Sequence, residues 1–597
     1  MSVSNSILQG AQHLAQGNIA AAEQLAHALL APGPDPDALH LLALVRIQQH
    51  RLDEAIQHLG RSLSIRPHHA HVLMNLGKVL LLAGRHGEAA AAMADAVAAD
   101  PGLADAWYEL GELQHRLGDP ASAEASWRRV LALVPGHQLA LLSLGVLLKD
   151  NDRPSESEAL LAQGFGDAQD PRLKSAFAYN LAFAQYGQGK KDAALENFAR
   201  VAKLDPGRSS VELTRADLLV ELSRFDEALA VMKDVIAREP LNPAAHQAYN
   251  DLLHSLGRDE EFLASYDKAP DHTPLALSKA GLLSLSKRTV EAHAAYEAVL
   301  AREPDNCDAM SGAAEALAQL GRHDEAVKTL EKALARAPDD PGLIRGLAIA
   351  SLQSRDPEKA AVMAEKCIAR APHDQLGLAV LGSAWRLMDD AREERLNGYD
   401  ELIQMFDLEP PQGFSDMASF NAELNEWLAQ VHPQTREPIN QSLRSGSQTR
   451  GNIFGAGHDL VERLKQRIAE AMQRYIAGIA PDAAHPFRGR RGAGFRFTGS
   501  WSSRLRDCGY HVNHVHPEGW ISSCYYVGVP DAVKDETQKQ GWIKFGEPSY
   551  DIGLGVRRAI QPVPGRLVLF PSYMWHGTVP FHSDTVRTTI AFDAVPR

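Results

Sequence analysis

The sequence predicts a multidomain protein in which an all-α solenoid of paired helices is followed by an α+β domain. Proline returns every 34 residues along most of the chain and loses this spacing before the last third. After residue 487, short runs rich in β-branched and aromatic residues alternate with Gly and Pro, as in sandwiches and small barrels. The chain has 597 residues, more than the roughly 250 to 300 at which a single core stops growing.

The phased prolines mark one repeated unit. A period of 34 residues is that of the tetratricopeptide helix-turn-helix. The best copy covers residues 104–137, where Trp107, Gly111, Ala123 and Trp127 stand at the aromatic and small positions of that unit. The prolines form three sets with this internal spacing: Pro67, Pro101 and Pro135; Pro206 and Pro240; Pro304, Pro338 and Pro372.

We expect these repeats to fill residues 1–390 as about ten or eleven helical pairs. A degenerate copy begins the array near residues 6–32, and a partial unit at 375–389 ends it. Two stretches, 150–170 and 250–274, break the phase and are expected to hold altered or shortened repeats. Stacked helical pairs present a long concave groove, so a protein or peptide is the expected partner.

Bulk properties exclude some functions. The net charge of -14 argues against nucleic acid as the main partner, because phosphate binding requires clustered Lys and Arg. Residues 1–10 lack the pattern of a signal peptide, and no run of about 18 apolar residues occurs. We therefore expect a cytoplasmic protein with no membrane partner.

Residues 391–597 are expected to form the α+β domain, with a helical lead-in over 391–486 and a β-barrel over 487–597. The Ser, Arg, Gln and Gly content of 441–451 predicts an ordered loop or flap. Expected helices are 399–408, 420–431 and 458–479; expected strands are 494–500, 510–516, 520–529, 560–562, 566–570 and 588–594.

Histidines gather in one short segment of the predicted barrel. Residues 511–518 read H-V-N-H-V-H-P-E. Because side chains alternate along a strand, His514, His516 and, if the strand continues, Glu518 project from one face, and His511 projects from the other. Two ligands spaced by two residues can bind one ion.

Two later residues complete the pattern. His576 follows a strand-like run 60 residues after His516, and Arg587 opens the last expected strand. A paired ligand motif, a distant histidine and a following arginine match the needs of a non-haem Fe(II) site with a dicarboxylate co-substrate. In such a site the arginine holds the far carboxylate of 2-oxoglutarate.

Residues 399–597 resemble 2-oxoglutarate and Fe(II)-dependent oxygenases that occur alone or fused to tetratricopeptide repeats and are distantly related to prolyl hydroxylases. This resemblance implies a double-stranded β-helix (jelly-roll) fold with iron in its mouth. The matching stretches are Q-S-L-R-S-G-S-Q-T at 441–449, H-V-H-P-E-G-W-I-S-S-C-Y-Y-V at 514–527, P-G-R-L-V-L-F-P-S-Y-M-W-H-G-T at 564–578 and R-T-T-I-A-F-D at 587–593.

Two ligand sets stay open. The H-x-H-P string, which we associate with this family, favours His514, His516 and His576. The pair His516 and Glu518 with His576 would restore the carboxylate that many oxygenases of this fold use; a set with His511, or no metal at all, is a further alternative. Three neutral imidazoles would leave the iron more positive than a set with a carboxylate.

The resemblance also implies residues that bind the co-substrate. Tyr526 resembles the tyrosine that donates its hydroxyl to the 2-oxoglutarate carboxylate, with a core aromatic as the alternative, and Tyr525 would point to the other face. Thr589 shares the strand face of Arg587 and is a second candidate donor. In the expected flap, Arg444, Gln448 and Thr449 either contact substrate or form a solvated loop. Four tryptophans are expected to build the barrel core or its mouth: Trp501, Trp520, Trp542 and Trp575.

The sequence therefore predicts an Fe(II)- and 2-oxoglutarate-dependent dioxygenase that uses O2 to hydroxylate a protein or peptide held by the repeats. A scaffold with a degenerate, metal-free barrel is one alternative. A three-histidine dioxygenase that does not use 2-oxoglutarate is another, and Arg587 argues against it, because such an enzyme needs no cation there.

Overall fold

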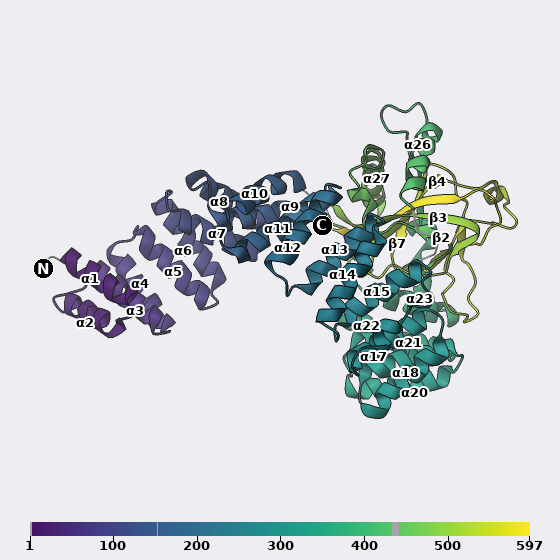
Figure 1. Ribbon diagram of the computed structural model, residues 1–597, viewed down its shortest axis with the longest axis horizontal. Helices are drawn as coiled ribbons and strands as arrows, with labels where there is room; N and C mark the ends of the chain where they lie inside the picture. Colours follow the sequence, from purple (N-terminus) through teal and green to yellow (C-terminus); the bar gives the residue numbers. More distant parts are fainter. Residues whose placement is uncertain (1–2, 152, 433–440, 493) are drawn as a thin grey trace. The chain divides into compact units, whose positions relative to one another are not determined.

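The structure is a computed structural model that describes residues 3–151, 153–432, 441–492 and 494–597 (Figure 1). Residues 1 and 2, within the amino-terminal stretch considered above, and 433–440, within the expected lead-in, lie outside the described residues. The chain divides into two compact units, residues 1–207 and 208–597. This division follows compactness alone, and a boundary near residue 390 between repeats and oxygenase-like domain stays a prediction.

The first unit is built from consecutive helical pairs. Gly111 shows why the small positions of the repeat matter: a Cβ there would lie 2.5 Å from Trp127 Nε1, so only glycine lets the paired helices approach. The helices are α1 Val3–Ala15, α2 Ile19–Leu30, α3 Pro36–Gln48, α4 Leu52–Ile65, α5 Ala70–Leu82, α6 His86–Ala99, α7 Ala104–Arg116, α8 Pro120–Leu133, α9 Gln138–Asp150, α10 Pro154–Asp167, α11 Pro171–Tyr186 and α12 Lys191–Leu204.

The second unit continues the same pattern. Its helices are α13 Ser209–Glu221, α14 Phe225–Arg238, α15 Pro243–Ser255, α16 Ala264–Asp267, α17 Thr273–Leu285, α18 Thr289–Arg302, α19 Cys307–Gln319, α20 His323–Arg336, α21 Pro341–Gln353, α22 Pro357–Arg370 and α23 Gln375–Leu387. The expected shortened repeat is present at α16, which has four residues and starts after Leu263 with a left-handed φ of 68°. The other phase break holds a complete helix, α10, so only one of the two is a shortened unit.

A lead-in then connects the repeats to the sheets. It comprises α24 Arg392–Asn397, α25 Tyr399–Leu402, β1 Gln404–Asp407, α26 Met417–Gln430 and α27 Asp459–Gly478, with short 3-10 helices η1 Ile453–Gly455 and η2 Arg488–Arg490. The predicted helix over 399–408 is wrong after Leu402, because β1 pairs with the strand β7 (Arg566–Pro571) as a sheet edge. The helices expected at 420–431 and 458–479 correspond to α26 and α27.

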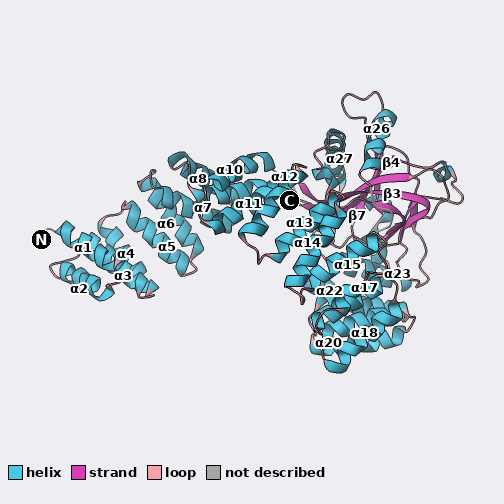
Figure 2. Ribbon diagram, in the orientation of Figure 1, coloured by secondary structure: helices cyan, strands magenta, loops and turns pink. Residues whose placement is uncertain are grey.

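Two antiparallel sheets form the remainder (Figure 2). One has the order β1-β7-β4-β9-β3-β2 and the other β6-β5-β8. Helices α26 and α27 contact strands β4 and β7 of the larger sheet. The new elements are β2 Leu443–Gln448, β3 Phe495–His511, β4 Ile521–Gly528, η3 Asp531–Lys534, β5 Ile543–Phe545, β6 Arg558–Ile560, β7 Arg566–Pro571, β8 His576–Thr578 and β9 Arg587–Pro596. The predicted fold class, a helical solenoid followed by a jelly-roll domain, is confirmed.

Several local predictions need correction. The stretch 441–451, expected as a loop or flap, contains the edge strand β2, which pairs with β3. Its polar residues give no local strand signal, and the strand forms by pairing with the distant β3. The strands expected at 494–500 and 510–516 belong together: β3 is continuous up to His511, and residues 512–516 leave the regular strand.

The last repeats pack directly against the jelly-roll within the second unit. The β5–β6 loop inserts Ile552, which is 1% exposed, into the apolar cluster of α21, α22 and α23. Arg386 of α23 donates hydrogen bonds to the carbonyls of Gly546 and Gly555 at 2.7 and 2.8 Å. Ser383 accepts a hydrogen bond from Trp575 Nε1 at 3.1 Å. The solenoid end therefore braces the segment that precedes His576.

Candidate metal centre

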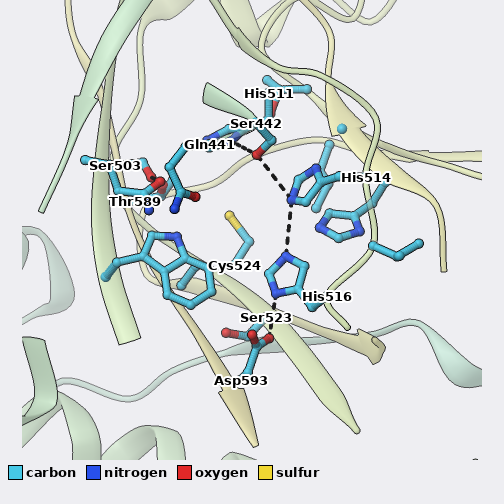
Figure 3. Close-up of a pocket in the computed structure, with 18 of the residues that line it drawn as sticks. Gln441, Ser442, Ser503, His511, His514, His516, Ser523, Cys524, Thr589 and Asp593 are labelled. Atoms are coloured by element: carbon cyan, nitrogen blue, oxygen red, sulfur yellow. Dashed lines mark hydrogen bonds and ion pairs between the residues drawn. The ribbon is translucent and has the colours of Figure 1, made fainter. Parts of the chain in front are cut away.

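A cavity of about 430 Å³ opens in the jelly-roll and is lined from both sheets (Figure 3). Alternate residues of β9 face it: Arg587, Thr589, Ala591 and Asp593. This period of two is that of one strand face. Further lining residues include His511, His514, His516 and Glu518 from the segment after β3, His576 from β8 and Trp501 from β3.

Three of these histidines converge on one point. One ring nitrogen from each of His514, His516 and His576 lies within 4.8 Å of the other two. His514 and His576 are held together by reciprocal backbone hydrogen bonds, N–H to carbonyl, at 2.9 and 3.1 Å. This isolated bridge joins the segment after β3 to β8. It brings together His514 and His576, which are 62 positions apart in the chain.

The hydrogen bonds at Nδ1 fix the orientation of each ring. His514 Nδ1 donates to the Val512 carbonyl at 2.8 Å, and His576 Nδ1 donates to the Met574 carbonyl at 2.9 Å. His516 Nδ1 donates to Asp593 Oδ1 at 2.6 Å. Metal-binding histidines commonly use one ring N–H in this way, which leaves Nε2 as the ligand atom.

Two of the rings, His514 and His576, are suited to remain neutral. Burial lowers the pKa of His514 to about 3, with the neighbouring His516 as the next cause. Burial, followed by the His514 charge, holds the pKa of His576 well below its ordinary value. A neutral imidazole has a lone pair available for a metal.

These residues fit a metal ion. Imidazole nitrogens bind first-row metals at about 2.1 Å, which puts two adjacent ligands about 3 Å apart. The Nε2 atoms of His514 and His516 are 3.2 Å apart. With both Nδ1 atoms donating elsewhere, two lone pairs face each other across this gap, and they repel unless a proton or a cation lies between them.

The alternative ligands, Glu518 and His511, line the cavity but are not part of the histidine cluster. Glu518 is exposed on the cavity wall and is not part of the histidine cluster. His511 also lines the cavity, where its Nδ1 contacts Ser442 Oγ at 3.1 Å. Asp593 is a residue to which the sequence assigned no role, although it ends the R-T-T-I-A-F-D stretch. Its signal was its place six residues after Arg587, on the same strand face.

Arg587 supplies the cavity with a buried cation. The residue is 1% exposed, and its Nε donates to the Gly541 carbonyl at 3.1 Å. Among the described residues no carboxylate forms an ion pair with it. Its guanidinium carbon lies 5.1 Å from the centre of the Tyr526 ring. A buried charge without a counter-ion favours an anionic ligand.

Tyr526 and Thr589 differ in their access to the cavity. Tyr526 is fully buried beneath Arg587, and its hydroxyl has no hydrogen-bond partner in the described part of the chain. Burial raises the pKa of Tyr526 well above its ordinary value. Tyr525 points to the opposite face, as expected, where its hydroxyl donates to Asn421 at 2.7 Å. Thr589 lines the cavity directly, opposite Tyr526 in the β9–β4 register.

Only part of the expected flap, residues 441–451, lines the cavity. Gln448 lines the cavity, as do Gln441 and Ser442. Thr449 instead pairs with Ser502, and Arg444 donates to the neighbouring carbonyls of Gln441 and Leu443. Of the four tryptophans, Trp501 borders the cavity, with its ring centre 5.5 Å from that of His516. The indole N–H groups of the other three donate hydrogen bonds within the protein: Trp520 to Phe487, Trp542 to Val533 and Trp575 to Ser383.

Comparison with known proteins agrees with this architecture. The model of the family described as "Putative 2OG-Fe(II) oxygenase" matches residues 499–593, which include all three clustered histidines, Arg587 and Asp593. Tetratricopeptide-repeat models match residues 8–67, 41–104, 108–171, 185–252 and 283–350. The chain is a tetratricopeptide-repeat protein fused to a 2OG-Fe(II) oxygenase domain. Among the described residues, no helix has the length and apolar character needed to cross a membrane.

Curated relatives of this fusion protein match it over part of their length. Protein O-mannosyl-transferase TMTC3 of Homo sapiens is 25% identical over 34% of this chain and 22% of its own. Tetratricopeptide repeat protein 5 of Mus musculus is 28% identical over 37% of this chain and 54% of its own. Among solved structures, MamA matches 29% of this chain and 94% of its own with 18% identity and a TM-score of 0.27. The chain thus spans about half or less of these curated relatives.

Proposed function

We propose that the chain is an Fe(II)- and 2-oxoglutarate-dependent dioxygenase that hydroxylates a protein or peptide recruited by its repeats. One observation carries the proposal: three histidine nitrogens converge in a cavity that also contains a buried arginine with no carboxylate partner among the described residues. The histidines suit a metal ion and the arginine suits an acidic co-substrate. The family match supports the same chemistry.

In this proposal His514, His516 and His576 hold Fe(II). When bound, the iron supplies the O2 activation that couples oxidative decarboxylation of 2-oxoglutarate to hydroxylation of the substrate. Arg587 binds the distal carboxylate of 2-oxoglutarate. The Tyr526 ring below the guanidinium favours the cation and limits where it can move. Thr589, on the same strand face, offers a hydroxyl to that carboxylate.

The repeats support a large substrate. Within the second unit, helices α21 to α23 pack against the β5–β6 loop of the oxygenase domain. A peptide bound along these repeats would therefore be attached to the same compact unit as the cavity. Recognition by an extended groove is the ordinary use of stacked helical pairs.

Addition of Fe(II) and then 2-oxoglutarate to the purified protein without oxygen tests the proposal. We expect a visible absorption band from charge transfer between the metal and the bound keto-acid. Iron binding without such a band would favour the three-histidine dioxygenase that does not use 2-oxoglutarate. Failure to bind iron at all would favour the scaffold.

A further inference from the structure

The cavity contains one carboxylate that touches a clustered histidine. Asp593 accepts the 2.6 Å hydrogen bond from His516 Nδ1, and its side chain is 14% exposed. The corresponding acceptors for His514 and His576 are neutral carbonyls at 2.8 and 2.9 Å. The shortest of the three bonds is thus the one to a carboxylate oxygen, as expected for a charge-assisted hydrogen bond.

Neighbouring strands hold this carboxylate in place. Asp593 lies opposite Ser522 of β4 and opposite Gly499 of β3 in the sheet register. The buried Ser522 hydroxyl donates to Asp593 Oδ1 at 2.6 Å and contacts Ser572 Oγ at 2.8 Å. The His516 backbone N–H donates to the Ser572 carbonyl at 3.0 Å. The imidazole and its carboxylate are therefore anchored to the same residues.

The carboxylate has no other cation to balance it. Within the described ranges, His516 is the only ion-pair partner of Asp593. Arg587, on the same face of β9, is six residues away, a separation of about 20 Å along a strand. A metal bound to His516 would place a positive charge near Asp593.

We propose that Asp593 is a positioning residue that fixes the His516 tautomer and supplies, through the imidazole, the negative charge that a set of three histidine ligands lacks. This inference rests on the proposed function, because it assumes a metal at the histidine cluster. A carboxylate hydrogen-bonded to a ligating histidine makes the imidazole a stronger donor and orients its Nε2 toward the metal. The Asp593 carboxylate would then act on the metal through the His516 imidazole and would not bind the metal itself.

The test measures metal affinity of the full-length protein with Co(II) alone, followed by absorbance in the absence of oxygen. Asp593→Asn keeps a hydrogen-bond acceptor of the same shape but removes the charge. We expect Co(II) affinity to fall by about 10- to 100-fold, while the melting temperature of the metal-free protein stays unchanged. Ser522→Ala, which removes only the support of the carboxylate, should cause a smaller loss. The exposed Asp531→Asn, at a residue outside the cavity and outside any metal-binding cluster, is the matched control and should bind as the wild type does.

A second readout separates charge from geometry. In the iron-loaded protein, Asp593→Asn should raise the midpoint potential, because less negative charge near the metal favours Fe(II) over Fe(III). Wild-type affinity and potential in Asp593→Asn would overturn the inference and leave the proposed metal centre intact. If Asp593→Asn is less stable than the wild type, the folded Ser522→Ala variant takes its place. Unchanged Co(II) affinity in Ser522→Ala would then overturn the inference and leave the proposed metal centre intact. If the wild type binds no Co(II), or His576→Ala binds it equally well, both the metal centre and this inference fail.

Discussion

At the scale of single residues, the site is defined by what each polar side chain contacts. The three clustered histidines all donate from Nδ1, which leaves their Nε2 atoms for a common ligand. Arg587 is buried with a carbonyl acceptor and an aromatic ring, neither of which neutralises its charge. Together these contacts suit a cation at one place and an anion at another.

The choice between ligand sets can be tested by comparing three alanine variants. His576→Ala and His514→Ala should each abolish stoichiometric iron binding and succinate formation, because each removes one of three strong donors. Glu518→Ala should keep both iron binding and succinate formation, since Glu518 is exposed and outside the cluster. Iron content by metal analysis and succinate release measure the outcome. A severe loss in Glu518→Ala together with a mild one in His514→Ala would refute this ligand set.

Arg587→Ala separates the co-substrate site from the metal ligands. Iron should stay bound, because no ligand is removed. The affinity for 2-oxoglutarate should fall by about 2 to 5 kcal/mol, roughly 30- to several thousand-fold, since the distal carboxylate loses a buried cation. Titration of the charge-transfer band with 2-oxoglutarate gives this value. An unchanged titration would remove Arg587 from the co-substrate site.

At the scale of elements, the edge strand β2 forms part of the cavity wall and is contacted by strand β3 and by His432. Its partner β3 provides the backbone pairing. His432, two residues after α26, contacts Ser447 Oγ of β2 at 2.9 Å through Nδ1 and Ser502 Oγ of β3 at 3.1 Å through Nε2. Burial, with the Arg504 charge as the next cause, lowers the pKa of His432 to about 3.

This histidine predicts a loss of stability in acid. An unfolded chain takes up a proton near pH 6.5, whereas folded His432 resists protonation until about pH 3. The stability that neutral His432 contributes is therefore fully present above pH 6.5 and is lost as the pH falls, by up to about 1.4 kcal/mol per pH unit. His432→Gln should flatten the decline in melting temperature between pH 6.5 and 4.5. The exposed His582→Gln should not, and equal slopes in all three proteins would contradict the assignment.

At the scale of the whole molecule, the oxygenase domain and the last repeats share a compact unit, residues 208–597. Tyr573 donates a hydrogen bond to the Leu396 carbonyl at 2.6 Å, and Trp575 donates to Ser383 of α23. Tyr573 and Trp575 lie three residues and one residue before His576 in the chain. The last repeat helix α23 and the lead-in helix α24 therefore both stabilise the segment that carries one of the proposed ligands.

Truncation tests this shared core. A fragment of residues 208–597 should be monomeric and should bind iron as the full chain does. A fragment of residues 399–597 keeps every proposed ligand but exposes Ile552 and Trp575, each worth about 1.5 to 3 kcal/mol of burial for a large apolar side chain. It should aggregate or bind iron weakly. Light scattering and iron content give the comparison, and equal behaviour of the two fragments would show that the repeats do not brace the centre.

The sequence by itself determined the periodic and ordered features of this protein. Phased prolines and small residues specify the helical pairs, because close approach at positions such as Gly111 depends only on the repeat itself. The order of the H-x-H motif, His576 and Arg587 indicated a metal and co-substrate site. Tertiary structure alone decided the rest. Asp593 gained a candidate role because sheet register sets it beside Ser522, and β2 is a strand because β3 pairs with it. Such contacts join residues far apart in the chain, so no local pattern records them.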